Sequence, residues 1–287
     1  MRVVHALLTG ILTLATSLCL TYALFGAGFV ACTTPQATSF IGNTFAGWEH
    51  AIFPKDDMAL IAEATRSFSI EGTSEEELYQ TIYEVLAKND TDLLESLGID
   101  SESIASYLDA DATADADTSS DSASQDTATD DGIGSFLANA LQSAGVSAYL
   151  EQYSLPANAI SHLQDCTPLF QTGRISVGVV AAFGLVGLIA LGILKGRRHI
   201  GGTCILGASL MLALLIGLAV WAILDFNSLF IWMHTMLFSQ GNWSFPSDSL
   251  LIQLFPEAFW AAMAGLWILT STLCAIVVLI VGRLLAR

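Results

Sequence analysis

The sequence predicts an all-α membrane protein with four transmembrane helices and a large, acidic segment between the first two. Of its 287 residues, 53% are hydrophobic and only 13% are charged, whereas about a quarter of the residues in soluble proteins are charged. The charged residues avoid four long apolar windows almost entirely. A bilayer core about 30 Å thick needs roughly 20 apolar residues in a helix, so each window is long enough to span it.

The first window, residues 4–30, has one ionisable residue, His5, at its edge. Its apolar core is much longer than the roughly 7–15 residues of a cleaved export signal, which favours a retained helix. The other three windows contain no charged residue at all. We expect them to be transmembrane helices over residues 175–194, 200–224 and 258–282.

Lys and Arg near the helix ends predict the orientation of the chain. If the helices alternate, six of the ten basic residues fall on one side, and none of the 27 acidic residues does. The six are Arg2, Lys195, Arg197, Arg198, Arg283 and Arg287. We therefore expect both termini and the loop of residues 195–199 in the cytoplasm, and all the acidic residues outside.

The first outer segment, residues 31–174, is expected to be mostly helical and partly disordered. Residues 73–76 are typical of a helix start, and the apolar residues that follow recur at helical spacing: Leu78, Ile82, Tyr83 and Leu86. Residues 109–131 contain eight Asp and no basic residue. Such a stretch buries too little apolar surface to offset its chain entropy, which predicts an acidic disordered linker.

The second outer segment, residues 225–257, is predicted to be an aromatic-rich loop. Aromatic residues at this density are typical of a membrane interface. They are Phe226, Phe230, Trp232, Phe238, Trp243, Phe245 and Phe255. Two of the five cysteines, Cys32 and Cys166, lie on the outer side, where an oxidising environment permits a disulfide; the sequence leaves open whether they are joined or remain thiols.

Two histidines are candidates for chemistry, because each lies just outside the outer end of a predicted span. His162 precedes the second span and His234 follows the third. Asp165 lies three residues after His162 and would face the same way on a helix, so it is expected to orient the imidazole. A positioned His is the commonest general acid or base. The alternative is that each histidine is an ordinary interfacial hydrogen-bonding residue.

Other kinds of site find little support in the sequence. His162, His234 and Asp165 are plausible zinc ligands, but no metal-binding spacing accompanies them, and we expect no metal and no cofactor. Motifs for a nucleophilic Ser or a phosphate-binding loop are missing. The acidic exterior would repel phosphate, which argues against nucleic-acid binding.

Two stretches resemble segments of a known family. The sequence His162-Leu163-Gln164-Asp165-Cys166 resembles a His-Met-x-Asp-Val segment, and the residues from Phe230 through His234 and Asn242-Trp243 to Glu257 resemble that family's second outer loop. The family comprises bacterial four-span membrane proteins and includes the lipoprotein intramolecular transacylase. Leu163 and Thr167 depart from the family pattern, which has Met and often Lys at these places.

The resemblance implies an acyltransferase of the bacterial cell membrane. Such an enzyme moves the sn-2 acyl chain of a diacylglyceryl-modified lipoprotein onto the amino group of that lipoprotein's N-terminal Cys. The resemblance implies that His162 and His234 are the catalytic pair, and that diacylglyceryl-modified lipoproteins and membrane lipid are the partners. We expect Asn242 and Trp243, together with backbone amides, to bind the substrate and donate hydrogen bonds to the developing oxyanion.

A non-enzymatic function is the alternative hypothesis. In it the protein is a membrane accessory or sensor protein that binds a partner through its acidic ectodomain. Deleting residues 109–131 separates the two hypotheses, since an enzyme should lose little activity and a binding protein should lose much of its binding.

Overall fold

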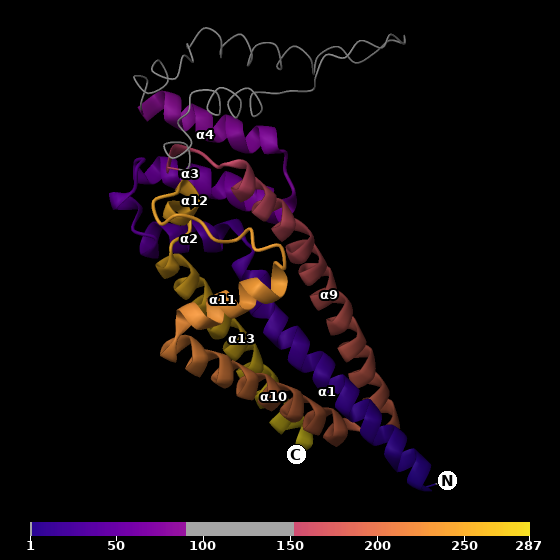
Figure 1. Ribbon diagram of the computed structural model, residues 1–287. Coiled ribbons are helices and arrows are strands. Elements are labelled where there is room, and N and C mark those ends of the chain that lie inside the picture. The colour runs from indigo at the N-terminus through magenta and orange to yellow at the C-terminus, as the bar shows by residue number, and fades with distance from the viewer. Residues whose placement is uncertain (1, 90–151) are drawn as a thin grey trace, which may run out of the picture. The chain divides into compact units, whose positions relative to one another are not determined.

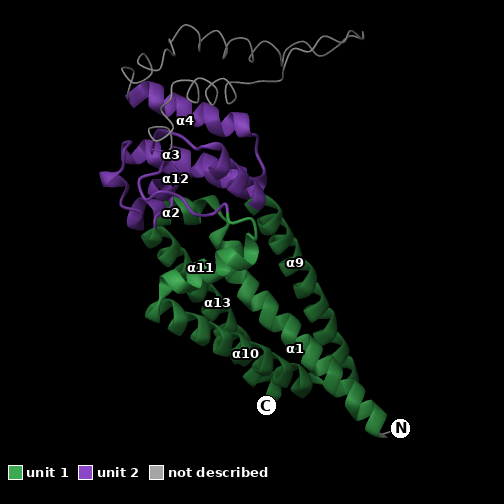
Figure 2. Cartoon of the chain, in the orientation of Figure 1, with its two compact units in different colours: residues 1–41, 166–241, 257–287 green, residues 42–165, 242–256 purple. Residues whose placement is uncertain are grey.

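The computed structural model describes residues 2–89 and 152–287, and it contains helices but no strand in these two ranges (Figure 1). The linker expected at residues 109–131 lies outside the described residues. Contacts divide the chain into two compact units: unit 1 contains residues 1–41, 166–241 and 257–287, and unit 2 contains residues 42–165 and 242–256 (Figure 2).

Four helices of the described chain are long and apolar enough to cross a membrane. They are α1 (Arg2–Cys32), α9 (Ala157–Lys195), α10 (Arg197–Leu224) and α13 (Glu257–Ala286). The predicted all-α fold with four transmembrane helices is confirmed.

The helix α9 begins well before the apolar window of residues 175–194. Pro156 precedes it, and the Pro156 carbonyl accepts hydrogen bonds from the amides of Ala159 and Ile160 at 2.8 and 3.0 Å. The helix then continues through Pro168 without a break. At 1.5 Å per residue its 39 residues measure about 58 Å, roughly twice the thickness of a bilayer core, so much of α9 extends beyond the hydrocarbon.

Small and hydroxyl residues let the helices of unit 1 approach closely. The Thr21 hydroxyl donates to the Gly207 carbonyl of α10 at 2.9 Å, and the Trp267 indole of α13 donates to the Phe25 carbonyl at 2.8 Å. A side chain at Gly201 would collide with the α13 backbone near Gly282. Close backbone approach at small residues is a common way of packing helices in a membrane, where lipid tails are as apolar as leucine.

Unit 2 is held together by a shared apolar core and by hydrogen bonds between distant segments. Its other described helices are α3 (Lys55–Arg66), α4 (Glu75–Asn89), the 3₁₀-helix η1 (Trp48–His50), the π-helix η2 (Ser67–Glu71) and α12 (Leu250–Leu254). The Trp48 indole donates to the Leu254 carbonyl at 3.1 Å, and the Tyr79 hydroxyl donates to the Leu155 carbonyl at 2.7 Å. The first bond fixes residues 242–256 against a part of the chain 206 positions away, and the second ties α4 to the segment just before α9.

The helix α4 begins as its sequence indicates. Ser74 precedes it, and the Ser74 hydroxyl accepts a hydrogen bond from the Glu77 amide at 3.1 Å, which satisfies one of the unpaired amides of the first turn. The apolar residues that were expected to share one face are all buried: Leu78, Ile82, Tyr83 and Leu86.

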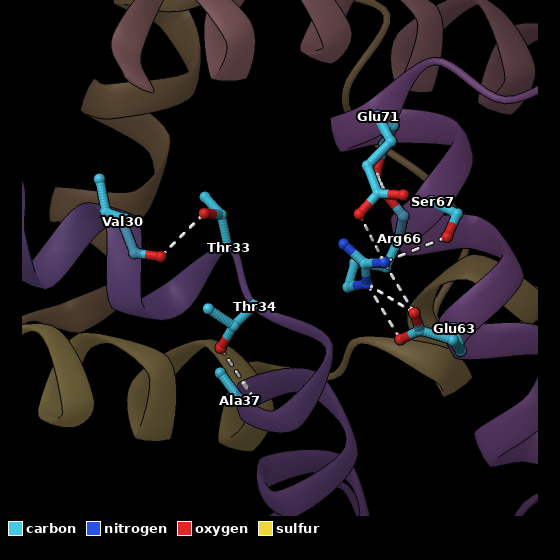
Figure 3. A network of polar contacts seen from close by, with 9 residues as sticks. Val30, Thr33, Thr34, Ala37, Glu63, Arg66, Ser67 and Glu71 are labelled. Carbon is cyan, nitrogen blue, oxygen red and sulfur yellow. Dashed lines mark hydrogen bonds and ion pairs between the residues drawn. The ribbon is translucent and has the colours of Figure 1, made fainter. Parts of the chain in front are cut away.

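A buried arginine joins α3 to η2 (Figure 3). Only 4% of Arg66 is exposed. Its Nε and Nη2 atoms both donate to the Glu63 carboxylate, at 2.9 and 2.7 Å, and Nη2 also reaches Glu71 at 3.0 Å. The guanidinium thus fixes the turn of π-helix that follows α3.

Two further elements complete the described chain. The helix α2 (Pro35–Phe45) follows α1. The helix α11 (Phe226–Leu237) occupies much of the second outer segment, which was expected to be a loop.

None of the five cysteines is joined in a disulfide, and the Cys32 thiol instead donates to the Met263 carbonyl at 3.4 Å.

Candidate active site

His162 lies in the second turn of α9, within unit 2. Its side chain is buried, with 8% exposed. The imidazole packs against the Phe245 ring, with 5.8 Å between the ring centroids. Phe245 belongs to the segment between α11 and α12, so the second outer segment covers one side of this histidine.

The same turn of α9 carries Asp165, which binds Asn242. The Asn242 amide Nδ2 donates to the Asp165 carboxylate at 3.0 Å and lies 3.5 Å from the Ser161 hydroxyl. An ionised carboxylate only accepts hydrogen bonds, so the NH₂ group of Asn242 must face it. This contact brings together two of the residues predicted for the site. A role for Asp165 in orienting His162 stays a prediction.

The other end of the Asn242 amide is unusual. Its Oδ1 atom is buried and has no hydrogen-bond partner among the residues that the structure describes. Most buried polar atoms in folded proteins are hydrogen-bonded, because a buried acceptor without a donor loses its hydration and gains nothing in return. Trp243, the next residue, is half-buried in the same turn.

His234 lies in the last turn of α11, within unit 1. It is also buried, with 8% exposed. Phe230 and Phe238 stand four residues to either side, and their ring centroids lie 3.9 and 5.7 Å from that of the imidazole. The Phe230 ring in turn contacts Trp260 of α13. The i−4 spacing places the Phe230 ring on the helix face that carries His234, and Phe238 is the residue that caps the end of α11.

A backbone hydrogen bond sets the tautomer of His234. Its Nδ1 atom lies 2.9 Å from the Phe230 carbonyl oxygen. A carbonyl oxygen can only accept, so Nδ1 carries the hydrogen and Nε2 is unprotonated in the neutral ring. Desolvation by burial lowers the pKa of His234 below its ordinary value of 6.5, and the bond to Phe230 only partly opposes this. The ring is therefore neutral at physiological pH.

The structure adds residues that the sequence prediction did not include. Phe245 and Ser161 contact predicted site residues from positions that no motif marks. Phe230 and Phe238 could have been found, because their spacing around His234 is helical and their segment was singled out as aromatic. Within residues 2–89 and 152–287, no three His, Cys, Asp or Glu side chains gather closely enough to hold a metal ion.

Comparisons with known proteins agree with this description. The family model of the lipoprotein intramolecular transacylase Lit matches residues 101–260. Among solved structures, the fold is similar to that of the membrane-integral lipoprotein intramolecular transacylase Lit from Bacillus cereus, with a TM-score of 0.55. That likeness covers 98% of this chain and 96% of the other at 13% sequence identity, so it concerns the fold alone. No curated protein sequence gives a match.

The family model covers more than half of the 287 residues, including both histidines, Asp165, Asn242 and Trp243. It also covers the whole of α9, α10, α11 and α12 and the first four residues of α13. The chain therefore belongs to the lipoprotein intramolecular transacylase (Lit) family.

Proposed function

We propose that this protein is a lipoprotein intramolecular transacylase of a bacterial cell membrane. It takes the sn-2 acyl chain from the diacylglyceryl group of a lipoprotein and places it on the amino group of that lipoprotein's N-terminal Cys. Family membership supports the reaction. The observation that carries the mechanism is the buried, neutral His234, whose Nε2 can accept a proton.

Every bond that the reaction forms or breaks, apart from those to the transferred protons, belongs to one substrate molecule. The amine nitrogen attacks the carbonyl carbon of the sn-2 ester, so a C–N bond forms and the C–O bond to glycerol breaks. The nitrogen loses one proton, and the departing glycerol oxygen gains one. Donor and acceptor belong to the same molecule, and well-oriented intramolecular reactions reach effective molarities of about 10⁵–10⁸ M. No covalent enzyme intermediate is needed.

His234 is the general base in this proposal. The Phe230 carbonyl holds the hydrogen on Nδ1, and the flanking Phe230 and Phe238 rings exclude water from the imidazole. A base must be unprotonated before the reaction begins, and the lowered pKa of His234 meets that requirement. A positioned base of this kind contributes about 10²–10⁴ in rate.

His162 is the partner that protonates the glycerol oxygen. It is buried beside Phe245 and lies one helical turn from the Asp165 carboxylate. In the proposed topology, with both termini in the cytoplasm, both histidines belong to outer segments.

Expression in a bacterial host that makes diacylglyceryl lipoproteins but lacks an N-acylating enzyme tests the proposal. Mass spectrometry of N-terminal lipopeptides should show an N-acyl, S-monoacylglyceryl Cys only when this protein is present. His162→Ala and His234→Ala should each abolish that product. His50→Ala and His199→Ala alter exposed histidines and serve as matched controls that should retain it. Full product in either site variant, or none with the unaltered protein, would refute the proposal.

A further inference from the structure

The buried Oδ1 atom of Asn242 is an acceptor that the fold provides and does not use. It has no hydrogen-bond donor among the described residues, although the Nδ2 atom of the same amide is bound to Asp165. The assignment of the two ends does not depend on how the amide is drawn, because the carboxylate can pair only with the NH₂ group. A donor from outside the protein would complete the amide.

The position of this acceptor is next to a proposed catalytic histidine. Asn242 contacts Ser161 and Asp165, which precede and follow His162 within one turn of α9. The amide therefore lies against the turn that carries His162. Phe245, three residues after Asn242, packs on the His162 ring, so the segment that carries Asn242 also contacts the imidazole.

We propose that Oδ1 of Asn242 accepts a hydrogen from the attacking amine and so selects a primary amine as the acyl acceptor. The inference rests on the transacylase function proposed above and names the group that holds the nucleophile. A neutral primary amine has two hydrogens. One leaves for the general base as the C–N bond forms, and the other remains on the nitrogen of the product amide. Asn242 binds the hydrogen that remains.

The Asp165 carboxylate strengthens the acceptor without touching the amine. A charge-assisted bond to Nδ2 polarises the amide and increases the negative partial charge on Oδ1. A carboxylate placed directly on the amine would instead favour its ammonium form, and an ammonium group has no lone pair for attack. The α-amino group of a peptide ordinarily titrates near 7.7–8.0, so a neutral acceptor keeps the nucleophile reactive at physiological pH.

This assignment changes the role that the sequence suggested for Asn242. The sequence marked it as a substrate-binding residue that donates to an oxyanion. Its donor end is hydrogen-bonded to Asp165 in the structure, and the end that remains for substrate is the oxygen. Backbone amides are then the candidates for the oxyanion donors.

Two synthetic diacylglyceryl lipopeptides test the proposal with the purified full-length protein. One has an ordinary N-terminal Cys, and the other has N-methyl-Cys, whose single amine hydrogen must leave with the base. The unaltered protein should acylate the first with a kcat/KM at least tenfold higher. Asn242→Leu has no acceptor and opens no cavity. It should slow the ordinary substrate at least tenfold and reduce the ratio between the substrates at least fivefold.

A merely structural role predicts a different result, since it would slow both substrates by the same factor. A preserved ratio in Asn242→Leu would therefore overturn the inference, as would undiminished activity. Asn227→Leu changes an exposed asparagine of α11 and should leave both rates unchanged. Absence of activity in the unaltered protein would instead count against the proposed function, so the two failures are distinguishable.

A reciprocal exchange, Asp165→Asn with Asn242→Asp, adds a pH readout. The exchange preserves a hydrogen bond between the two positions but turns a full carboxylate toward the amine. The rise of kcat/KM with pH should then move upward by one pH unit or more, because the carboxylate stabilises the ammonium form. An active exchange variant with the unaltered pH profile would also overturn the inference.

Discussion

The Nδ1 atom of His234 lies 2.9 Å from the carbonyl oxygen of Phe230, one turn earlier in α11. The helix itself therefore selects the tautomer of this imidazole and leaves Nε2 as the basic nitrogen. The same turn supplies the ring that desolvates it, since the Phe230 centroid lies 3.9 Å from that of His234. One short helical segment thus determines the protonation state, the tautomer and the burial of the proposed base.

Replacing His234 by asparagine should separate structure from catalysis. The Asn amide can donate to the Phe230 carbonyl as Nδ1 does, but it has no basic nitrogen. We expect His234→Asn to fold with nearly unchanged thermal stability and to lose about 10²–10⁴ of the transacylation rate, the usual contribution of a general base. Measured rates with a synthetic diacylglyceryl lipopeptide check this. A variant that keeps more than a tenth of the activity would contradict the assigned role.

The pH dependence of the unaltered enzyme follows from the pKa of His234. Burial lowers that pKa below 6.5, and the base acts only when neutral. As the pH falls, the loss of activity that is due to His234 should therefore begin only below 6.5, when the imidazole becomes protonated. The substrate amine titrates near 7.7–8.0 and gives a separate decline at higher pH. Rates measured with a saturating lipopeptide from pH 4.5 to 8 would show this, and a decline centred above 6.5 that depends on His234 would contradict it.

Removing one of the two Phe rings that flank His234 should shift the pH dependence of activity to higher pH. Phe238→Ala admits water to the imidazole, which weakens the desolvation that lowers the pKa of His234. The decline of activity that follows protonation of His234 should therefore occur at a higher pH, closer to 6.5. Phe226→Ala is a matched control, because Phe226 contacts the Phe230 ring and lies about two helical turns before His234 in α11. An equal shift in both variants would indicate a general loosening of α11.

Replacing Arg66 by lysine keeps the positive charge but should still destabilise the protein. Arg66 donates to Glu63 through two nitrogens and to Glu71 through one of them, a fork that a lysine ammonium cannot reproduce. We expect Arg66→Lys to destabilise the protein by about 1–3 kcal/mol, the cost of leaving buried groups poorly paired. Denaturant unfolding in detergent measures it. Glu49→Gln, an exposed change, should alter stability by no more than about 0.5 kcal/mol.

Much of the fold was predictable because a bilayer imposes simple requirements. Long windows without charge must be helices in lipid, and four such windows gave the four spans. Ser74 and the apolar residues of α4 follow local rules of capping and periodicity, and the structure agrees with both. The length of α9 was not predictable in the same way, since Pro168 ordinarily interrupts a helix and here lies inside one.

The site was predictable only in part. His162 and His234 stood out because each is a histidine that lies just outside the outer end of a predicted span. The bond between Asp165 and Asn242 joins positions 77 residues apart, and no local pattern encodes such a contact. The tautomer of His234 depends on a backbone carbonyl that becomes available only once α11 forms within a segment that the sequence presented as a loop.

The central claim is that this protein transfers an acyl chain within a single lipoprotein molecule. A crossover experiment with the purified protein tests it most directly. Two diacylglyceryl lipopeptides of different peptide mass are mixed, and only one carries a deuterated sn-2 chain. We predict that mass spectrometry will find the deuterated chain as an N-acyl group only on its own peptide. Deuterated N-acyl groups on both peptides, or no N-acylation at all, would contradict the account.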